Sequence, residues 1–390
     1  MDRRASVPYA YDFVGGQLVG SSAATQQQPV TGYSTGVAHL NSLQALRALA
    51  ATTVIFDHIP FARWGSFGVD IFFVLSGFVI CHISSTDSSH FFSKRIFRVV
   101  PLYWLCTFAV ATIALIAPSL LVNTSFSGVA LLKSLFFIPF RRPDHHVAPL
   151  LFLGWTLHFE MLFYAIFGIA LRVTRKHARV LAIAGLVALF AIGKLFRVYH
   201  HSNLVLNFYS KFVIMEFAFG ILCYVLWNRY GAAVRRVPGL LVLAAATTSY
   251  SFFILMDVHV LDSYGPFFKH VPDILLRGVP ASLILLAFLS VEDRIKFPAL
   301  VLLIGDASYS LYLLHPYILE ILNRKMFALD HLSVFTTVVT IVFIAICYAC
   351  AVLSFKYFER PSNKLLRNLF LRRPSATRES DTLSPVLVKS

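Results

Sequence analysis

The chain has 390 residues, of which 57% are hydrophobic and only 14% are charged, and its mean hydropathy is +0.71. Soluble domains carry about 25% charged residues, so this composition excludes an ordinary soluble enzyme and predicts an integral membrane protein. The net charge of +15 fits basic loops that face anionic lipid head groups, and we expect membrane lipids and no nucleic acid among the partners.

The predicted fold is all-α and integral to the membrane, with about ten transmembrane helices in a domain over residues 40–360. Residues 1–39 are rich in Gly, Ser, Thr and Gln and predict a disordered cytoplasmic tail, and residues 361–390 predict a basic cytoplasmic tail. Each expected span has about 20 apolar residues. The ten spans are 42–59, 66–84, 99–118, 151–171, 178–193, 208–227, 239–256, 274–290, 299–322 and 334–356.

With the N-terminus in the cytoplasm, the loops expected on the cytoplasmic side hold about twice as many Lys and Arg residues as the outer loops. An even number of spans then places both termini in the cytoplasm. We expect a multi-pass protein of the bacterial cytoplasmic (inner) membrane.

Two ionisable residues interrupt the first span, in "LRALAATTVIFDH". Arg47 and His58 are eleven residues apart, which places them on one helical face about 16 Å from each other. Ala51 and Val54 lie between them, so this face predicts one wall of a passage. The alternatives are an arginine that reaches toward the membrane surface and a histidine at the interface without a chemical role.

Further polar side chains are expected at membrane depth. In "WTLHFEMLFY", Glu160 lies near the middle of the fourth span with Tyr164 one turn later, and a buried carboxylate needs a partner, for which Arg47 is the natural choice. In "GVDIFFVLSGF", Asp70 is one short loop from His58 and is expected to orient that imidazole.

The ninth span carries "GDASYSLYLLHP", in which Ser308, Tyr312 and His315 share one helical face. A substrate-binding stripe and a set of purely structural hydrogen bonds between helices remain equal alternatives.

Three basic residues begin the third span in "FFSKRIFRVVPLYW": Lys94, Arg95 and Arg98. Arg95 and Arg98 share a face, so their guanidiniums can bind one polyphosphate, although cytoplasmic loops are generally basic. Cys347 and Cys350 form a C-x-x-C inside an apolar run without a second pair, so we interpret them as packing thiols and expect no metal site.

Together these motifs resemble the integral-membrane acyltransferases of acyltransferase family 3, over about residues 40–360. The motifs occur in the family's order, from R-x10-H through "GVDIFFVLSGF", R-x-x-R and E-x-x-F-Y to "GDASYSLYLLHP". "GWTLHFEMLFY" is most similar to the exopolysaccharide-production branch. That branch has Asn-Tyr before the glutamate, and here His158 and Phe159 alter either the acceptor or only the packing.

The resemblance implies an O-acetyltransferase that takes the acyl group from acetyl-CoA, without a metal. Arg95 and Arg98 would bind the donor's phosphates, and His58 would act as general base on a hydroxyl of a polysaccharide or glycolipid acceptor. Arg47, Glu160 and Asp70 would assist catalysis, while Tyr164, Ser308, Tyr312 and His315 would bind substrate. A small glycosylated or lipid-linked acceptor, a transporter or flippase, and a structural subunit are the alternatives.

Overall fold

The computed structural model describes residues 40–59, 67–121, 124–198, 203–259, 271–326 and 334–371. They belong to one unit, which starts at Val37. Most of residues 1–39 and 361–390, expected as tails, lie outside the described residues. The described part is helical and contains no strand. Its α-helices are α1 Asn41–Asp57, α2 Phe67–Thr86, α3 Phe91–Ile116, α4 Gly128–Leu135, α5 Trp155–Val173, α6 Ala178–Val198, α7 Leu204–Tyr209, α8 Ile214–Arg236, α9 Gly239–His259, α10 Val271–Ser290, α11 Ala299–Asp306, α12 Ser308–Met326, α13 Val334–Ser354 and α14 Arg360–Leu371.

Nine of the ten predicted spans each overlap one long helix, and the ninth span overlaps two, because a helix satisfies its own backbone hydrogen bonds within a lipid environment. Fewer helices than expected are long and apolar enough to cross a membrane on their own. Among the described residues there are six, or seven if the bent pair α11 and α12 counts as one. The short helix α1 and the short apolar parts of α9 and α10 do not reach this length, so the expected ten spans are not confirmed.

The expected ninth span, 299–322, is not one straight helix. It breaks at Ala307, where α11 and α12 meet at 75°. The break turns the carbonyl of Gly305 and the side chain of Ser308 toward α1. The kink therefore presents polar groups to a helix that carries a charge.

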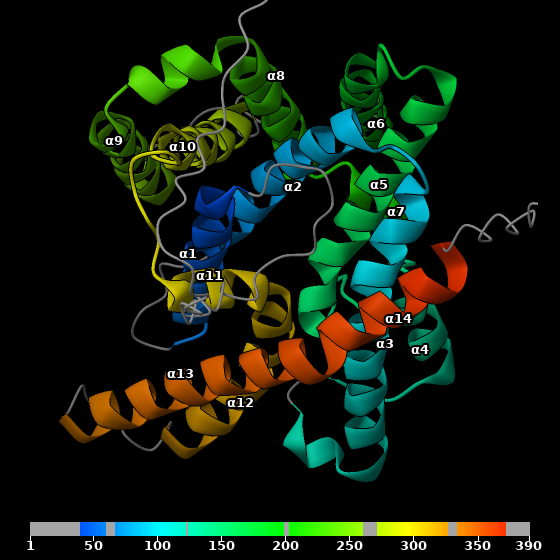
Figure 1. The fold of residues 1–390 in the computed structure, drawn as a ribbon. Coiled ribbons are helices and arrows are strands. Elements are labelled where there is room, and N and C mark those ends of the chain that lie inside the picture. Colours follow the sequence, from blue (N-terminus) through cyan, green and yellow to red (C-terminus); the bar gives the residue numbers. More distant parts are fainter. Residues whose placement is uncertain are drawn as a thin grey trace, which may run out of the picture. The chain divides into compact units, whose positions relative to one another are not determined.

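Helix α2 lies at the centre of the bundle, packed against α1, α8 and α10 (Figure 1). Glycines allow the closest approach. A Cβ on Gly220 of α8 would lie 2.0 Å from the carbonyl oxygen of Val74 on α2, and one on Gly77 would lie 2.2 Å from the carbonyl oxygen of Phe217. Only glycine lets two helices approach this closely.

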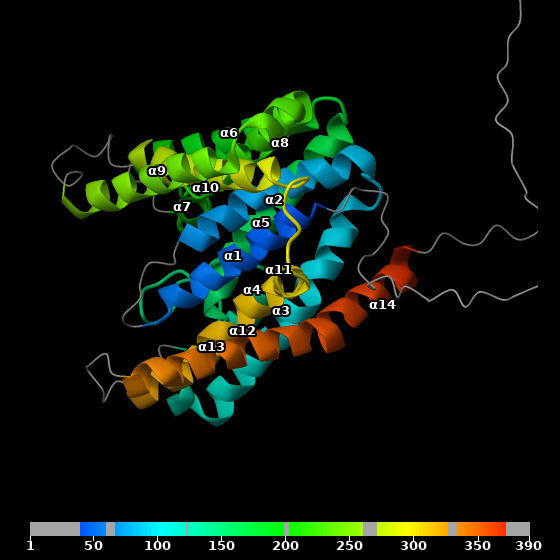
Figure 2. The ribbon, with the colours of Figure 1, turned by 60° about the vertical axis from the view of Figure 1, so that its left-hand side comes forward.

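Helices α13 and α14 follow each other through a turn of π-helix, Phe355–Glu359, and run past α12 and α3 (Figures 1 and 2). Helices α8, α9 and α10 form a second group on the far side of α2 (Figure 2). The charged residues of the candidate site lie where α1, α2, α3, α5 and α12 meet.

Candidate functional site

A partly open cleft with about 790 Å³ of empty space lies between α1, α2, α3, α5 and α12. Its walls are mainly apolar. Seven of the ten site residues expected from the sequence line it: Arg47, Arg95, Arg98, Glu160, Tyr164, Ser308 and Tyr312. Residues far apart in the chain thus meet around one cavity, with three cations to one carboxylate.

Arg47 does not form the expected ion pair with Glu160. Its Nε and Nη2 donate hydrogen bonds to the Ser308 hydroxyl, at 3.1 and 2.9 Å, and Nε also donates to the Gly305 carbonyl at 3.2 Å. The break between α11 and α12 provides both acceptors. A neutral hydroxyl and a carbonyl hold the guanidinium in place without cancelling its charge.

Glu160 is held by hydroxyl groups. The Tyr164 hydroxyl, one turn along α5, donates a very short hydrogen bond to Glu160, and Ser76 Oγ on α2 lies 3.5 Å from the same carboxylate oxygen. Both hydroxyls lie at the same carboxylate oxygen, so hydroxyl groups and not a cation are the described hydrogen-bond partners of Glu160.

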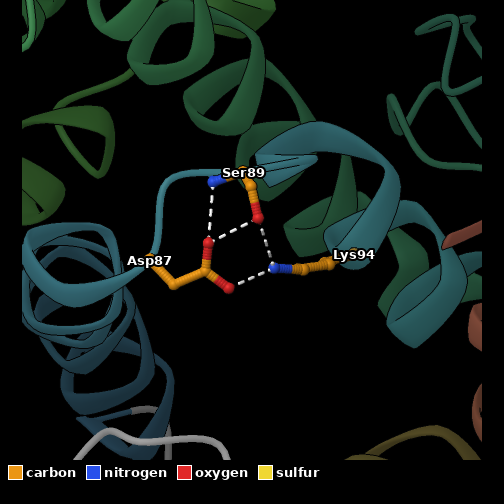
Figure 3. A network of polar contacts seen from close by, with 3 residues as sticks. All are labelled: Asp87, Ser89 and Lys94. Atoms are coloured by element: carbon orange, nitrogen blue, oxygen red, sulfur yellow. Dashed lines mark hydrogen bonds and ion pairs between the residues drawn. The ribbon is translucent and has the colours of Figure 1, made fainter. Parts of the chain in front are cut away.

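The three basic residues at the start of α3 differ in their partners, and Figure 3 shows those of Lys94. Lys94 donates hydrogen bonds to Asp87 and to Ser89, in the loop before α3. The bond from Lys94, with help from Ser89, lowers the pKa of Asp87 to about 2, so this carboxylate stays charged at neutral pH. Lys94 is therefore neutralised locally.

Arg95 and Arg98 face the cleft, and the structure describes no hydrogen bond or ion pair from either guanidinium to another described residue. Arg95 is only 7% exposed and its Nε is buried without a hydrogen-bond partner. Its guanidinium lies 5.9 Å from the ring of Phe91. A buried, unsatisfied guanidinium in a cleft is suited to an anionic ligand.

His58, at the end of α1, is in contact with His315, which lies within α12. His315 Nε2 lies 3.4 Å from His58 Nδ1, and the rings meet edge to face. The Nδ1 atoms also lie 2.9 Å from backbone carbonyl oxygens, of Val54 for His58 and of Leu311 for His315. A carbonyl only accepts, so each Nδ1 carries the proton and each Nε2 is basic.

Neither histidine lines the cleft. Tyr312 lies between them and the cavity: it lines the cleft, shares a hydrogen bond of 2.8 Å with the Thr156 hydroxyl, and has its ring 6.1 Å from that of Phe72. On its other side its ring lies 6.3 Å from the ring of His315. Tyr312 thus contacts both the cleft and the histidine pair.

The expected passage along α1 is not present. Ala51 and Val54, between Arg47 and His58, are each 1% exposed and packed in apolar clusters. Small side chains on α1 allow close packing with α11 and α12 here.

Asp70 does not orient His58, contrary to expectation. Its carboxylate lies 3.7 Å from Arg277 of α10, next to the fully buried Glu216 of α8. Helix α2 points this side chain toward α8 and α10, away from α1. Both partners were visible in the sequence as ionisable residues in apolar runs, which is an indication of a buried polar cluster.

Sequence reasoning also missed Glu359, in the π-turn after α13. It is 8% exposed and accepts a hydrogen bond of 2.6 Å from Ser310 Oγ on α12, and its charge acts on Arg47 and Arg98. A π-turn in an otherwise α-helical segment is frequent at functional sites. The sequence indication is a carboxylate, Glu359, directly after the apolar run of α13.

The side chains that depart from the branch pattern serve packing. His158 is 1% exposed and bonds the Gly154 carbonyl at 2.8 Å, and the ring of Phe159 stacks on that of Phe208. Neither residue lines the cleft.

Cys347 is buried and Cys350 is partly exposed, and neither is in a disulfide. No group of three metal-binding side chains gathers among the described residues.

A bundle of apolar helices around a cationic cleft defines a membrane protein that can hold an anionic ligand between its helices. Residues 40–353 match the acyltransferase domain family, and the chain belongs to this family of membrane acyltransferases. It is therefore an acyltransferase enzyme, as the sequence resemblance predicted.

The chain is similar to the exopolysaccharide production protein ExoZ of Rhizobium meliloti, with 36% identity over 272 residues, which are 68% of this chain and 80% of ExoZ. It is 27% identical to the peptidoglycan O-acetyltransferase OatA of Listeria monocytogenes over 375 residues, which are 84% of this chain and 56% of OatA. The chain thus spans little more than half of OatA. No solved structure matches it.

Proposed function

We propose that the enzyme transfers an acetyl group from cytoplasmic acetyl-CoA to a hydroxyl of a surface polysaccharide or exopolysaccharide, in the bacterial cytoplasmic membrane. The observation that carries the proposal is the cationic cleft that ends one tyrosine away from a pair of histidines. The relatives support the acceptor class, because one is named for exopolysaccharide production and another for O-acetylation of peptidoglycan.

Arg95 and Arg98 bind the phosphates of CoA at the cytoplasmic mouth of the cleft. Three arginines against one carboxylate make the cavity attractive to a polyanion, and guanidiniums bind phosphate through paired N–H donors. The apolar walls accommodate the pantetheine arm. Arg47, held by Ser308, keeps its positive charge beside this path.

His58 is the general base, and His315 positions it. The Nδ1–H of His58 faces the Val54 carbonyl and His315 Nε2, so Nε2 of His58 accepts the proton. His315 is itself fixed by the Leu311 carbonyl. In this proposal His315 orients the imidazole of His58, the role that the sequence analysis assigned to Asp70.

In the transfer step, His58 Nε2 takes the proton of the acceptor hydroxyl, and the hydroxyl oxygen attacks the carbonyl carbon of the thioester. The carbon–sulfur bond breaks, the thiolate of CoA receives the proton from the imidazolium, and the products are an O-acetyl ester and free CoA. Tyr312, with its hydroxyl bound to Thr156, separates the donor cleft from the histidines, so its side chain turns aside before transfer.

The test uses purified protein in detergent with radiolabelled acetyl-CoA and alkali-deacetylated exopolysaccharide. We expect release of free thiol together with label in the polymer. His58→Ala should lower the turnover about 10²–10⁴-fold, the usual contribution of a positioned general base, with little change in CoA binding. His315→Gln should lower turnover less, because His58 then loses only its orienting contact.

A wild-type protein that releases no thiol would overturn the proposed reaction in favour of a transporter or a structural subunit. Near-normal turnover in His58→Ala, with loss in His315→Gln, would move the general base to His315. Full activity in both variants would rule out general-base catalysis by this pair.

A further inference from the structure

The C-terminal helix α14 lies beyond the residues that the family match covers, which end at 353. Helix α13 and α14, with the π-turn between them, form 38 helical residues, far more than the about 20 that cross a bilayer. Since α13 alone has 21 residues, α14 extends past the hydrocarbon core. It lies against α3 (Figure 1), where the ring of Phe370 contacts that of Phe97 in the N-terminal part of α3.

Helix α14 is amphipathic, and its two faces have different surroundings. Leu365, Leu369 and Phe370 are more than half exposed, which suits a helix in the interface of a membrane. Phe370 also has its ring 5.6 Å from that of Phe97 on α3. Arg367 lies three residues before Phe370, so it faces α3 as well.

Arg367 lies close enough to Arg95 for its positive charge to act on that guanidinium. Arg98 acts on Arg95 in the same way. Three like charges from two helices repel one another unless an anion lies between them. Because Arg95 is more than nine-tenths buried, lines the cleft and has an unsatisfied Nε, an anion there would bind it first.

We infer that Arg367 of α14 is a third cation of the donor site and binds phosphate of CoA together with Arg95 and Arg98. The inference rests on the proposed function, and it adds a residue from outside the matched domain. The amphipathic helix holds Arg367 at the membrane surface, where a soluble nucleotide donor arrives. In this arrangement α14 binds the part of the donor that is nearer the cytoplasm, and α3 binds the part that lies deeper in the cleft.

Phosphate is also the chemistry of anionic lipid head groups, so the experiment must separate the two sources. Binding of CoA by isothermal titration is measured in a neutral detergent without lipid, for the wild-type protein and for Arg367→Gln, Arg367→Lys and Lys364→Gln. Lys364 is the matched control: it is an exposed cation on the same helix, and its charge is not among those that act on Arg95. The same titrations are then repeated in nanodiscs that contain phosphatidylglycerol.

We expect Arg367→Gln to weaken CoA binding about fivefold in detergent, since a partly exposed charge contributes modestly. Arg367→Lys should recover part of this loss, and Lys364→Gln should bind as the wild type does. Equal affinities of wild type and Arg367→Gln in detergent, with a difference only in phosphatidylglycerol nanodiscs, would make Arg367 a lipid contact and overturn the inference. Equal losses in Arg367→Gln and Lys364→Gln would also overturn it, because general charge would then explain both.

The outcome is distinguishable from failure of the proposed function. If the wild type binds CoA but does not turn over acetyl-CoA, the reaction is refuted and the comparison of the variants still decides the role of Arg367. If the wild type does not bind CoA, the donor site and the inference are both refuted.

Discussion

At the scale of single residues, Lys94 and Arg98 illustrate how a partner decides the role of a charge. Both lie in the first turns of α3, and both belong to the basic residues expected on the cytoplasmic side. Asp87 and Ser89 bind Lys94, whereas Arg98 lines the cleft. Lys94 therefore stabilises the loop before α3, whereas Arg98 faces the space in which we propose that the donor binds.

This difference gives a prediction with a built-in control. Arg98→Gln should raise the KM for acetyl-CoA about tenfold or more at little changed kcat, since a charge-assisted hydrogen bond contributes about 1.5–3 kcal/mol. Lys94→Gln should leave the KM unchanged. Thiol-release kinetics over a range of acetyl-CoA concentrations measure both. An unchanged KM for Arg98→Gln would contradict phosphate binding, and Arg98 would then only belong to the basic residues that set the orientation in the membrane.

Arg47 and Glu160 also show that the partner decides the role of a charge, although the sequence suggested that they are partners of each other. Two opposite charges at membrane depth suggest an ion pair, yet each has a hydroxyl partner of its own, Ser308 for the arginine and Tyr164 for the carboxylate. Hydroxyl groups satisfy each charge without neutralising it. Both charges therefore remain available to act on a substrate.

At the scale of helices, close contacts at glycine decide how α2 and α8 cross. The Cβ of an alanine at position 220 would lie 2.0 Å from the backbone oxygen of Val74, and a backbone atom cannot move aside as a flexible side chain can. The helices would have to separate along the centre of the bundle.

We therefore expect Gly220→Ala to destabilise the protein by about 1–3 kcal/mol, the usual cost of overpacking, and to lower its melting temperature in detergent. Gly231→Ala on the same helix is the control. Its nearest neighbours would lie at 3.7 Å, an ordinary contact, and alanine favours the helix. Fluorescence-monitored thermal unfolding compares the two. An unchanged melting temperature in Gly220→Ala would show that the bundle adapts without cost.

At the scale of the whole molecule, the number of crossings fixes on which sides of the membrane the two termini lie. An even number places both termini on one side, and an odd number places them on opposite sides. In the part of the chain that the structure describes, six helices are individually long and apolar enough, and the bent pair α11 and α12 makes a seventh if it forms one span. Helix α1, with 17 residues, and helices α9 and α10, whose apolar parts are short, decide whether the expected ten is reached.

The distribution of Lys and Arg predicts both termini in the cytoplasm. A protease-cleavable tag at each end should then be protected in intact spheroplasts and cleaved in inverted vesicles. Cleavage of one tag alone in spheroplasts would require an odd number of crossings. Cleavage of both would reverse the orientation proposed for the donor cleft.

Much of the fold and part of the site could be predicted from sequence. Hydropathy locates the helical segments because a helix depends on local hydrogen bonds and on apolar residues within one segment, but it did not give the break in the ninth span. The motifs identify the family and seven residues that line the cleft. The predicted partners were less successful, as the Arg47–Glu160 pair and the orientation of His58 by Asp70 were both wrong.

The sequence by itself thus determined the helices, the membrane environment and part of the set of ionisable residues inside the bundle. Only the tertiary structure decided which of them meet. Arg47 bonds Ser308, 261 residues away, and His58 contacts His315, 257 residues away. Such pairs depend on a 75° break in one helix and on the angle at which others cross. Those features follow from packing between distant segments, and no local pattern of residues encodes them.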